Sequence, residues 1–170
     1  MNRMRKVLIA DDEVKVGQLV KRLIQWDRLG LTCIGLVTDG QTAYEKILSE
    51  SPDIVITDIR MPVLTGLEMI QKASEQGVKC HFIVVSGYKY FDYAQKALKY
   101  GVEDYLLKPI DEDELNRQLQ KIVAEEEQRE DKQQQVDQIE KKLEDSKYLR
   151  HKEFLRQILS QKQENIDAAN

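Results

Sequence analysis

The stretch IVITDIRMP, residues 54–62, carries a short run of aliphatic and β-branched residues directly into an aspartate, Asp58. A run of this kind is typical of a central strand in a parallel sheet, where helices cover both faces. The stretch therefore predicts a buried strand that delivers a carboxylate at its carboxyl end. Short runs of similar composition occur at residues 7–10, 32–37, 81–85 and 103–107.

Helical periodicity fills the intervals between these runs. Apolar residues recur at spacings of three and four within residues 16–24, 43–48, 67–73 and 93–101. Strands that alternate with helices form parallel sheets, and right-handed crossovers leave few topologies open. We therefore expect an α/β fold with a doubly wound, five-stranded parallel sheet.

Composition excludes several classes of protein. The 170 residues carry a net charge of −4 with no basic patch, so no nucleic-acid surface is expected. No stretch approaches the roughly 18 apolar residues of a membrane span, and we expect a cytoplasmic protein with no membrane contact. Cys33 and Cys80 lack metal-ligand spacing and are expected to be small buried apolar residues.

Residues with chemical function follow four of the expected strands. Asp11 and Asp12 follow the first, Asp58 the third, Ser86 the fourth, and Lys108 the fifth. The carboxyl ends of parallel strands share one edge, where ligands bind. Two carboxylates about 4 Å apart repel by roughly 4 kcal/mol at an effective dielectric near 20, so three of them require a cation. The pattern predicts a pocket for Mg²⁺ and a phosphoryl group.

Simpler and rival interpretations exist for these residues. The acidic cluster Asp11-Asp12-Glu13 could cap the following helix, and Asp58 alone could be a turn residue. A haloacid-dehalogenase-type phosphatase would need a second aspartate two positions after Asp58, where this chain has Arg60. A dinucleotide-binding enzyme would need a glycine-rich turn at residues 11–13. The two enzyme classes are disfavoured.

At these positions the sequence resembles the response-regulator receiver family over residues 5–123. A looser resemblance, to receivers fused to AraC-type helix-turn-helix domains, rests on residues 86–94 and 105–110, on Trp26 and on Leu29-Gly30. The family resemblance is carried by Asp11-Asp12, by Asp58 to Pro62 with Gly66, and by Ser86, Tyr105 and Lys108-Pro109.

The resemblance implies a role for each matching residue. Asp58 would accept a phosphoryl group from a sensor histidine kinase, and Lys108 would neutralise a phosphoryl oxygen. Ser86 and Tyr105 would be the switch residues, and Pro109 would follow a cis peptide. The ligands of Mg²⁺ would be Asp11, Asp12, Asp58 and the backbone carbonyl of Arg60.

Two features beside the switch residues have open interpretations. Gly87 is either a loop glycine that needs a positive φ or a position where a side chain would crowd the phosphodonor. The aromatic residues between 88 and 100 belong partly to the core and partly to an interaction surface. In the family, the face of the fourth and fifth helices changes partners after phosphorylation, so a homodimer through it is expected.

The chain changes character after Pro109, because no glycine or proline follows Pro109. A long helix is predicted from Asp111, with a helical coiled-coil linker at 124–147 and the start of a truncated output or middle domain at 148–170. The apolar seam at Leu115, Leu119 and Ile122 is interrupted and then resumes in a shifted frame. A solvated single helix and a parallel dimer both fit this pattern. The interrupting residues are Glu126, Arg129 and Gln133, and the seam resumes at Val136, Ile139 and Leu143.

The sequence thus predicts a phosphoacceptor protein of a two-component system, not an enzyme with a substrate of its own. We expect it to control transcription through a DNA-binding region absent from these 170 residues. The alternative is a self-contained receiver that signals through coiled-coil contacts with a protein partner.

Overall fold

The computed structural model describes residues 3–87 and 102–169. Its contacts divide the chain into two units, Met1–Val123 and Ala124–Asn170, and each is described by itself. The aromatic cluster between 88 and 100 and the helical pattern at 93–101 lie outside the described residues.

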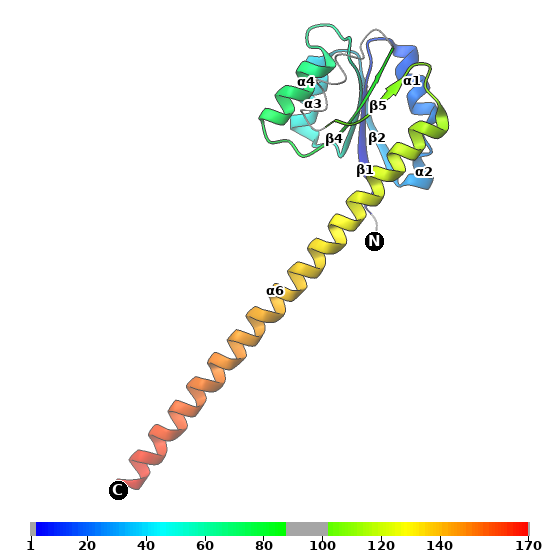
Figure 1. Ribbon diagram of the computed structural model, residues 1–170. Coiled ribbons are helices and arrows are strands. Elements are labelled where there is room, and N and C mark those ends of the chain that lie inside the picture. Colours follow the sequence, from blue (N-terminus) through cyan, green and yellow to red (C-terminus); the bar gives the residue numbers. More distant parts are fainter. Residues whose placement is uncertain (1–2, 88–101, 170) are drawn as a thin grey trace. The chain divides into compact units, whose positions relative to one another are not determined.

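The first unit is built on a parallel sheet, which confirms the predicted fold class. Its strands form one sheet (Figure 1). Their order is β2-β1-β3-β4-β5, and every neighbouring pair runs parallel. The central strand β3 is buried at all of its residues, as its uninterrupted apolar run predicts. The strands are β1 Arg5–Ala10, β2 Leu31–Val37, β3 Ile54–Asp58, β4 His81–Ser86 and β5 Val102–Leu107.

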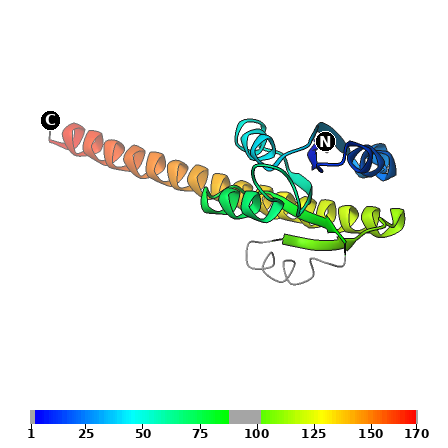
Figure 2. The same cartoon turned by 90° about the horizontal axis from the view of Figure 1, so that it is seen from above.

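Helices cover both faces of this sheet. α3 and α4 pack on one face, while α1, α2 and the first turns of α6 pack on the other (Figure 1). Figure 2 shows the same elements from above. The one-turn helix α2 was not predicted from the sequence. The helices are α1 Val14–Leu23, α2 Trp26–Leu29, α3 Gly40–Glu50, α4 Gly66–Glu75 and α6 Glu112–Ala168.

Side-chain caps fix the starts of the helices near the carboxyl edge of the sheet. Asp39 accepts a hydrogen bond from the Thr42 N–H at the start of α3. Thr65 and Glu68 form a reciprocal capping box at the start of α4, which satisfies two backbone N–H groups. These caps hold the loops that follow β2 and β3 in defined positions.

The root of α6 belongs to the globular core, which corrects one expectation. Leu115, Leu119 and Ile122 are at most 2% exposed and pack with residues of α1 and of strands β1, β3, β4 and β5. They were expected to form the first part of a coiled-coil seam. A coiled-coil seam and a helix packed on a sheet both show 4-3 spacing, because each buries a narrow apolar stripe.

Beyond Val123 the long helix exposes its apolar side chains. α6 has 57 residues, which corresponds to about 85 Å at 1.5 Å per residue. The division of this part into a linker at 124–147 and a further domain from 148 remains a prediction. The exposed apolar side chains include Val136, Ile139, Leu143, Tyr148, Leu149, Phe154, Leu155, Ile158, Leu159 and Ile166.

Two remaining expectations concern the cysteines and the membrane. Cys33 and Cys80 are both free thiols and both partly buried. Burial, with the nearby Asp53 carboxylate, raises the pKa of the Cys80 thiol to about 12, so it stays protonated. Among the residues that the structure describes, no helix combines the length and apolarity needed to cross a membrane.

Candidate functional site

Asp58 is the last residue of β3 and lies at the carboxyl edge of the sheet. Its side chain is buried, and its Oδ1 accepts a hydrogen bond of 2.7 Å from the Ile59 N–H. The Thr57 hydroxyl donates to the Asp58 backbone carbonyl at 2.9 Å. One carboxylate oxygen and the backbone are thus held, while Oδ2 faces the other residues of the site.

Gly66, the first residue of α4, lies directly against the backbone of Asp58. A methyl group at Gly66 would be 2.0 Å from the Asp58 carbonyl oxygen, far inside van der Waals contact. The Gly66 N–H donates to the Ile59 carbonyl at 2.8 Å. Glycine at position 66 is therefore required for the close approach between the end of β3 and the start of α4.

Asp11 and Asp12 follow β1, and the structure separates their environments. Asp11 is 5% exposed and its Oδ1 accepts a 2.9 Å hydrogen bond from the Glu13 N–H, whereas the Asp12 side chain is exposed. The residue at the N-cap of α1 is Glu13, and its side chain makes no capping hydrogen bond. The interpretation of the aspartates as helix caps is therefore wrong.

Lys108, which follows β5, joins the two buried aspartates. Its Nζ lies 3.2 Å from Oδ2 of Asp58 and 3.4 Å from Oδ2 of Asp11. Its backbone N–H donates to the Ser86 carbonyl at 2.9 Å, and the Lys108-Pro109 peptide is cis, as the family resemblance implied. The residues at the carboxyl ends of β1, β3 and β5 therefore form one charged cluster, which consists of Asp11, Asp58 and Lys108.

The charges of this cluster act on one another. Burial raises the pKa of Asp11 to about 6, although the Glu13 N–H and Lys108 lower it in part. Burial lowers the pKa of Lys108, but the Asp58 and Asp11 carboxylates outweigh this effect and the net shift is upward. Lys108 thus stays charged, while the high pKa of Asp11 indicates that its negative charge is incompletely compensated.

The expected switch residues flank the cluster on neighbouring strands. Ser86 ends β4 and is 1% exposed, and the partly buried Tyr105 donates its hydroxyl hydrogen to the Gly87 carbonyl at 3.1 Å. Gly87 does not have a positive φ, so that interpretation is wrong. Among the described residues, none has an atom within 4 Å of a side chain added at Gly87.

The acidic residues fit a divalent cation. Carboxylate oxygens of Asp11, Asp12 and Glu13 lie within 4.8 Å of one another, as one hard cation requires. Glu13 belongs to this acidic group although it was not among the predicted ligands, and Asp58, a predicted ligand, is not part of the group. Arg60 is exposed and lies two residues after Asp58. Its carbonyl as a ligand remains a prediction.

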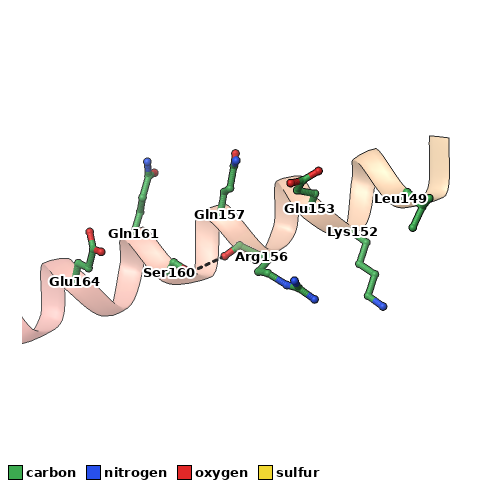
Figure 3. Close-up of a pocket in the computed structure, with 8 residues that line it drawn as sticks. All are labelled: Leu149, Lys152, Glu153, Arg156, Gln157, Ser160, Gln161 and Glu164. Atoms are coloured by element: carbon green, nitrogen blue, oxygen red, sulfur yellow. Dashed lines mark hydrogen bonds between the residues drawn. The ribbon is translucent and has the colours of Figure 1, made fainter. Parts of the chain in front are cut away.

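A surface hollow along α6 is not a second site. Its walls all come from α6, and the side chains point to different sides of one helix (Figure 3). Because its lining residues in the described part of the chain all belong to one helix, it offers no enclosed volume for a ligand. The residues along it are Leu149, Lys152, Glu153, Arg156, Gln157, Ser160, Gln161 and Glu164.

Comparison with known proteins agrees with this geometry. Residues 7–120 match the model of the response regulator receiver domain. An uncharacterized transcriptional regulatory protein of Bacillus subtilis, YesN, is 46% identical over 122 residues, which are 72% of this chain and 33% of YesN. The transcriptional regulatory protein HptR of Staphylococcus aureus is 35% identical over 120 residues, 71% of this chain and 47% of HptR.

A solved structure shows the same fold. The receiver domain of AraT, a response regulator from Geobacillus stearothermophilus, superposes with a TM-score of 0.71 at 36% identity and covers 75% of this chain and 98% of that domain. The chain belongs to the response regulator receiver family. It spans between a third and a half of the length of the curated relatives it matches.

Proposed function

We propose that this chain is the phosphorylated switch of a two-component system and that Asp58 accepts the phosphoryl group from a sensor histidine kinase. The observation that carries the proposal is the setting of the Asp58 carboxylate. One oxygen is held by the Ile59 N–H, and the other lies 3.2 Å from the Lys108 ammonium. The carboxylate is thus oriented beside the Lys108 ammonium, which can also interact with the negative charge of a phosphoryl group on Asp58.

The chemistry follows from these positions. A carboxylate oxygen of Asp58 attacks phosphorus, the P–N bond to the donor histidine breaks, and the imidazole leaves. Lys108 offsets the charge of a phosphoryl oxygen as a point charge. When bound, Mg²⁺ supplies further charge neutralisation between the phosphoryl oxygens and the acidic residues. Asp11, Asp12, Asp58 and the Arg60 carbonyl are the proposed ligands.

The phosphorylated state would be read by Ser86 and Tyr105. In this proposal the Ser86 hydroxyl binds a phosphoryl oxygen, and Tyr105 changes its packing behind it. The hydrogen bond from the Tyr105 hydroxyl to the Gly87 carbonyl gives this change a definite starting point. Gly87 directly follows Ser86. Movement of Ser86 would therefore displace the Gly87 carbonyl, which accepts the hydrogen bond from the Tyr105 hydroxyl.

The response would leave the domain through α6 and through a homodimer. We propose control of transcription in the cytoplasm by a DNA-binding region outside these residues, since the relatives YesN and HptR are named transcriptional regulatory proteins. A parallel pairing of α6 would use Val136, Ile139 and Leu143, which are 46–60% exposed. The alternative output is a protein partner on this helix, and the reading frame after residue 170 discriminates between them.

The test is phosphorylation by a small donor. With acetyl phosphate and Mg²⁺, intact-protein mass spectrometry should show one added phosphoryl group that is labile at alkaline pH. Asp58→Asn should lose it, whereas Asp27→Asn, at an exposed position in α2, should retain it. Undiminished labelling of Asp58→Asn, or equal labelling in excess chelator, would overturn the proposal.

A further inference from the structure

A buried asparagine lies in the apolar root of α6. Asn116 is 3% exposed, and its neighbours Leu115 and Leu119 belong to the core between α1 and the sheet. Its Oδ1 accepts a hydrogen bond from the Gln25 N–H at 2.9 Å. Its Nδ2 donates to the Leu23 carbonyl at 2.9 Å and to the Glu112 carbonyl at 2.8 Å.

The two partners of Asn116 outside α6 lie at the junction of α1 and α2. Leu23 is the last residue of α1, and Gln25 is the N-cap residue of α2. Backbone groups at helix ends lack partners within their own helix and need them elsewhere. A single carboxamide therefore satisfies one carbonyl and one N–H of this junction, and both of its own donors and its acceptor are used.

The apolar contacts at the root of α6 define the register of this helix less strictly than the hydrogen bonds of Asn116 do. Leu115, Leu119 and Ile122 repeat at spacings of four and three, and apolar burial is non-directional. A shift of α6 by one turn would bring an apolar residue back to some of these positions. The same shift would carry Asn116 about 5 Å away from the Leu23 carbonyl and the Gln25 N–H, and would leave these buried polar groups unpaired, whereas the bond to Glu112 lies within α6 and moves with it.

We infer that Asn116 is the positioning residue of α6, which fixes the register of the helix root on the α1–α2 junction. Sliding of packed helices by about one turn is a known type of conformational switch. The register lock follows from the contacts alone. The consequence for signalling is that a displacement of α6 after phosphorylation must break these hydrogen bonds. This consequence rests on the proposed function.

Three variants test the inference. Asn116→Leu removes all three hydrogen bonds at similar volume, and Asn116→Asp keeps the acceptor for Gln25 but removes both donors. Gln120→Leu is the matched control, because this amide lies one turn later at an exposed position and only accepts a 3.4 Å contact from Arg28. Near-ultraviolet circular dichroism establishes that each variant is folded.

Two measurements report on the register. Amide hydrogen exchange at Gln25 should become roughly ten times faster or more in Asn116→Leu, as expected for loss of a buried hydrogen bond, and less so in Asn116→Asp. Spin labels at Lys21 and Arg117, both exposed, should give a broader or doubled distance distribution in Asn116→Leu only. Cys33 and Cys80 are replaced by alanine in all labelled proteins.

The outcomes separate the inference from the proposed function. Unchanged exchange at Gln25 with an unchanged distance distribution in Asn116→Leu, or equal broadening in Gln120→Leu, would overturn it. Uptake of phosphoryl groups from acetyl phosphate is measured in the same proteins and should persist in Asn116→Leu. If the parent protein takes up none, the proposed function fails while the register result stands.

Discussion

The Nζ of Lys108 lies 3.2 Å from the Oδ2 of Asp58, although the two residues are 50 positions apart in the chain. The same ammonium group contacts Asp11 at 3.4 Å. In the unphosphorylated protein, Lys108 therefore offsets part of the charge of two buried carboxylates. The residue proposed to bind the phosphoryl group also supports the fold.

Replacing this lysine should destabilise the domain. Lys108→Met should lower the free energy of unfolding at pH 7 by about 2 kcal/mol, because charged hydrogen bonds to two buried carboxylates are lost. Urea denaturation followed by circular dichroism measures the change. Lys79→Met, at an exposed position in the same unit, is the control. Equal stability of the Lys108 and Lys79 variants would show that the contacts contribute nothing.

Stability should also depend on the protonation of Asp11. Its pKa is about 6 in the folded protein against 3.8 ordinarily, so the folded state binds the proton more tightly than the unfolded state. The free energy of unfolding of the metal-free protein should therefore fall as pH rises from about 4 to about 6, by about 3 kcal/mol.

Asp11→Asn should remove most of this slope in denaturant titrations at fixed pH. Asp39 provides a control of opposite sign, because hydrogen bonds from Thr42 hold its pKa below 3.8. Its contribution is present above pH 4 and is lost only as pH falls further, so Asp39→Asn should leave the slope between pH 4 and 6 intact. A slope that survives in Asp11→Asn would assign it to another group.

Asp12 should matter for the cation and not for the fold. Its side chain is exposed and caps no helix, so Asp12→Ala should leave the stability of the metal-free protein unchanged or slightly higher. Mg²⁺ affinity should fall by at least about 10- to 100-fold, the loss typical of removing a group one shell further from a metal, because Asp12 is a proposed ligand. Isothermal titration calorimetry measures this, with Asp27→Ala as control. Unchanged affinity would remove Asp12 from the site.

The loop after β3 contains a strained residue. Val63 has a φ of 69° and is 82% exposed, a conformation that β-branched residues rarely adopt. Val63→Asn should raise the free energy of unfolding by about 1 kcal/mol, since asparagine tolerates this region. Val14→Asn, an exposed valine in helical conformation, should show no gain. If Val63→Asn leaves the free energy of unfolding unchanged or lowers it, the backbone conformation of Val63 does not strain the protein.

Self-association should depend on the exposed part of α6. Phosphorylation of Asp58 should tighten it roughly 5- to 150-fold, which corresponds to a coupling of 1 to 3 kcal/mol. Ile139→Lys should weaken it and leave phosphorylation intact, whereas Gln138→Lys should not. Leu119→Lys should instead unfold the domain, because Leu119 is fully buried. Sedimentation at matched concentrations tests this, and identical dimer fractions throughout would exclude the helix as the switched element.

Much of the fold was predictable because the central strands are apolar on both faces. The predicted run at 54–57 became β3 with one residue added, Asp58. The first strand begins two residues earlier than predicted, since Arg5 and Lys6 pair with β2 despite their charge. The helix α2 was missed because four residues are too short to show a period.

The charged cluster was predictable for a different reason. Parallel strands bring their carboxyl ends together, so order along the chain was enough to bring Asp11, Asp58 and Lys108 to one edge. The roles of Leu119 and Asn116 were not accessible in this way. A stripe at 4-3 spacing fits a coiled coil and a globular helix equally, and a polar residue within it gives no indication of burial.

The contact between Gly66 and the Asp58 carbonyl has a mechanical consequence. Because the two backbones leave no room for even one methyl group, the end of β3 and the first turn of α4 cannot move toward each other. The hydrogen bond from the Gly66 N–H to the Ile59 carbonyl opposes their separation. The phosphoacceptor and α4 are therefore rigidly coupled, and any displacement of the Asp58 backbone carries the start of this helix with it.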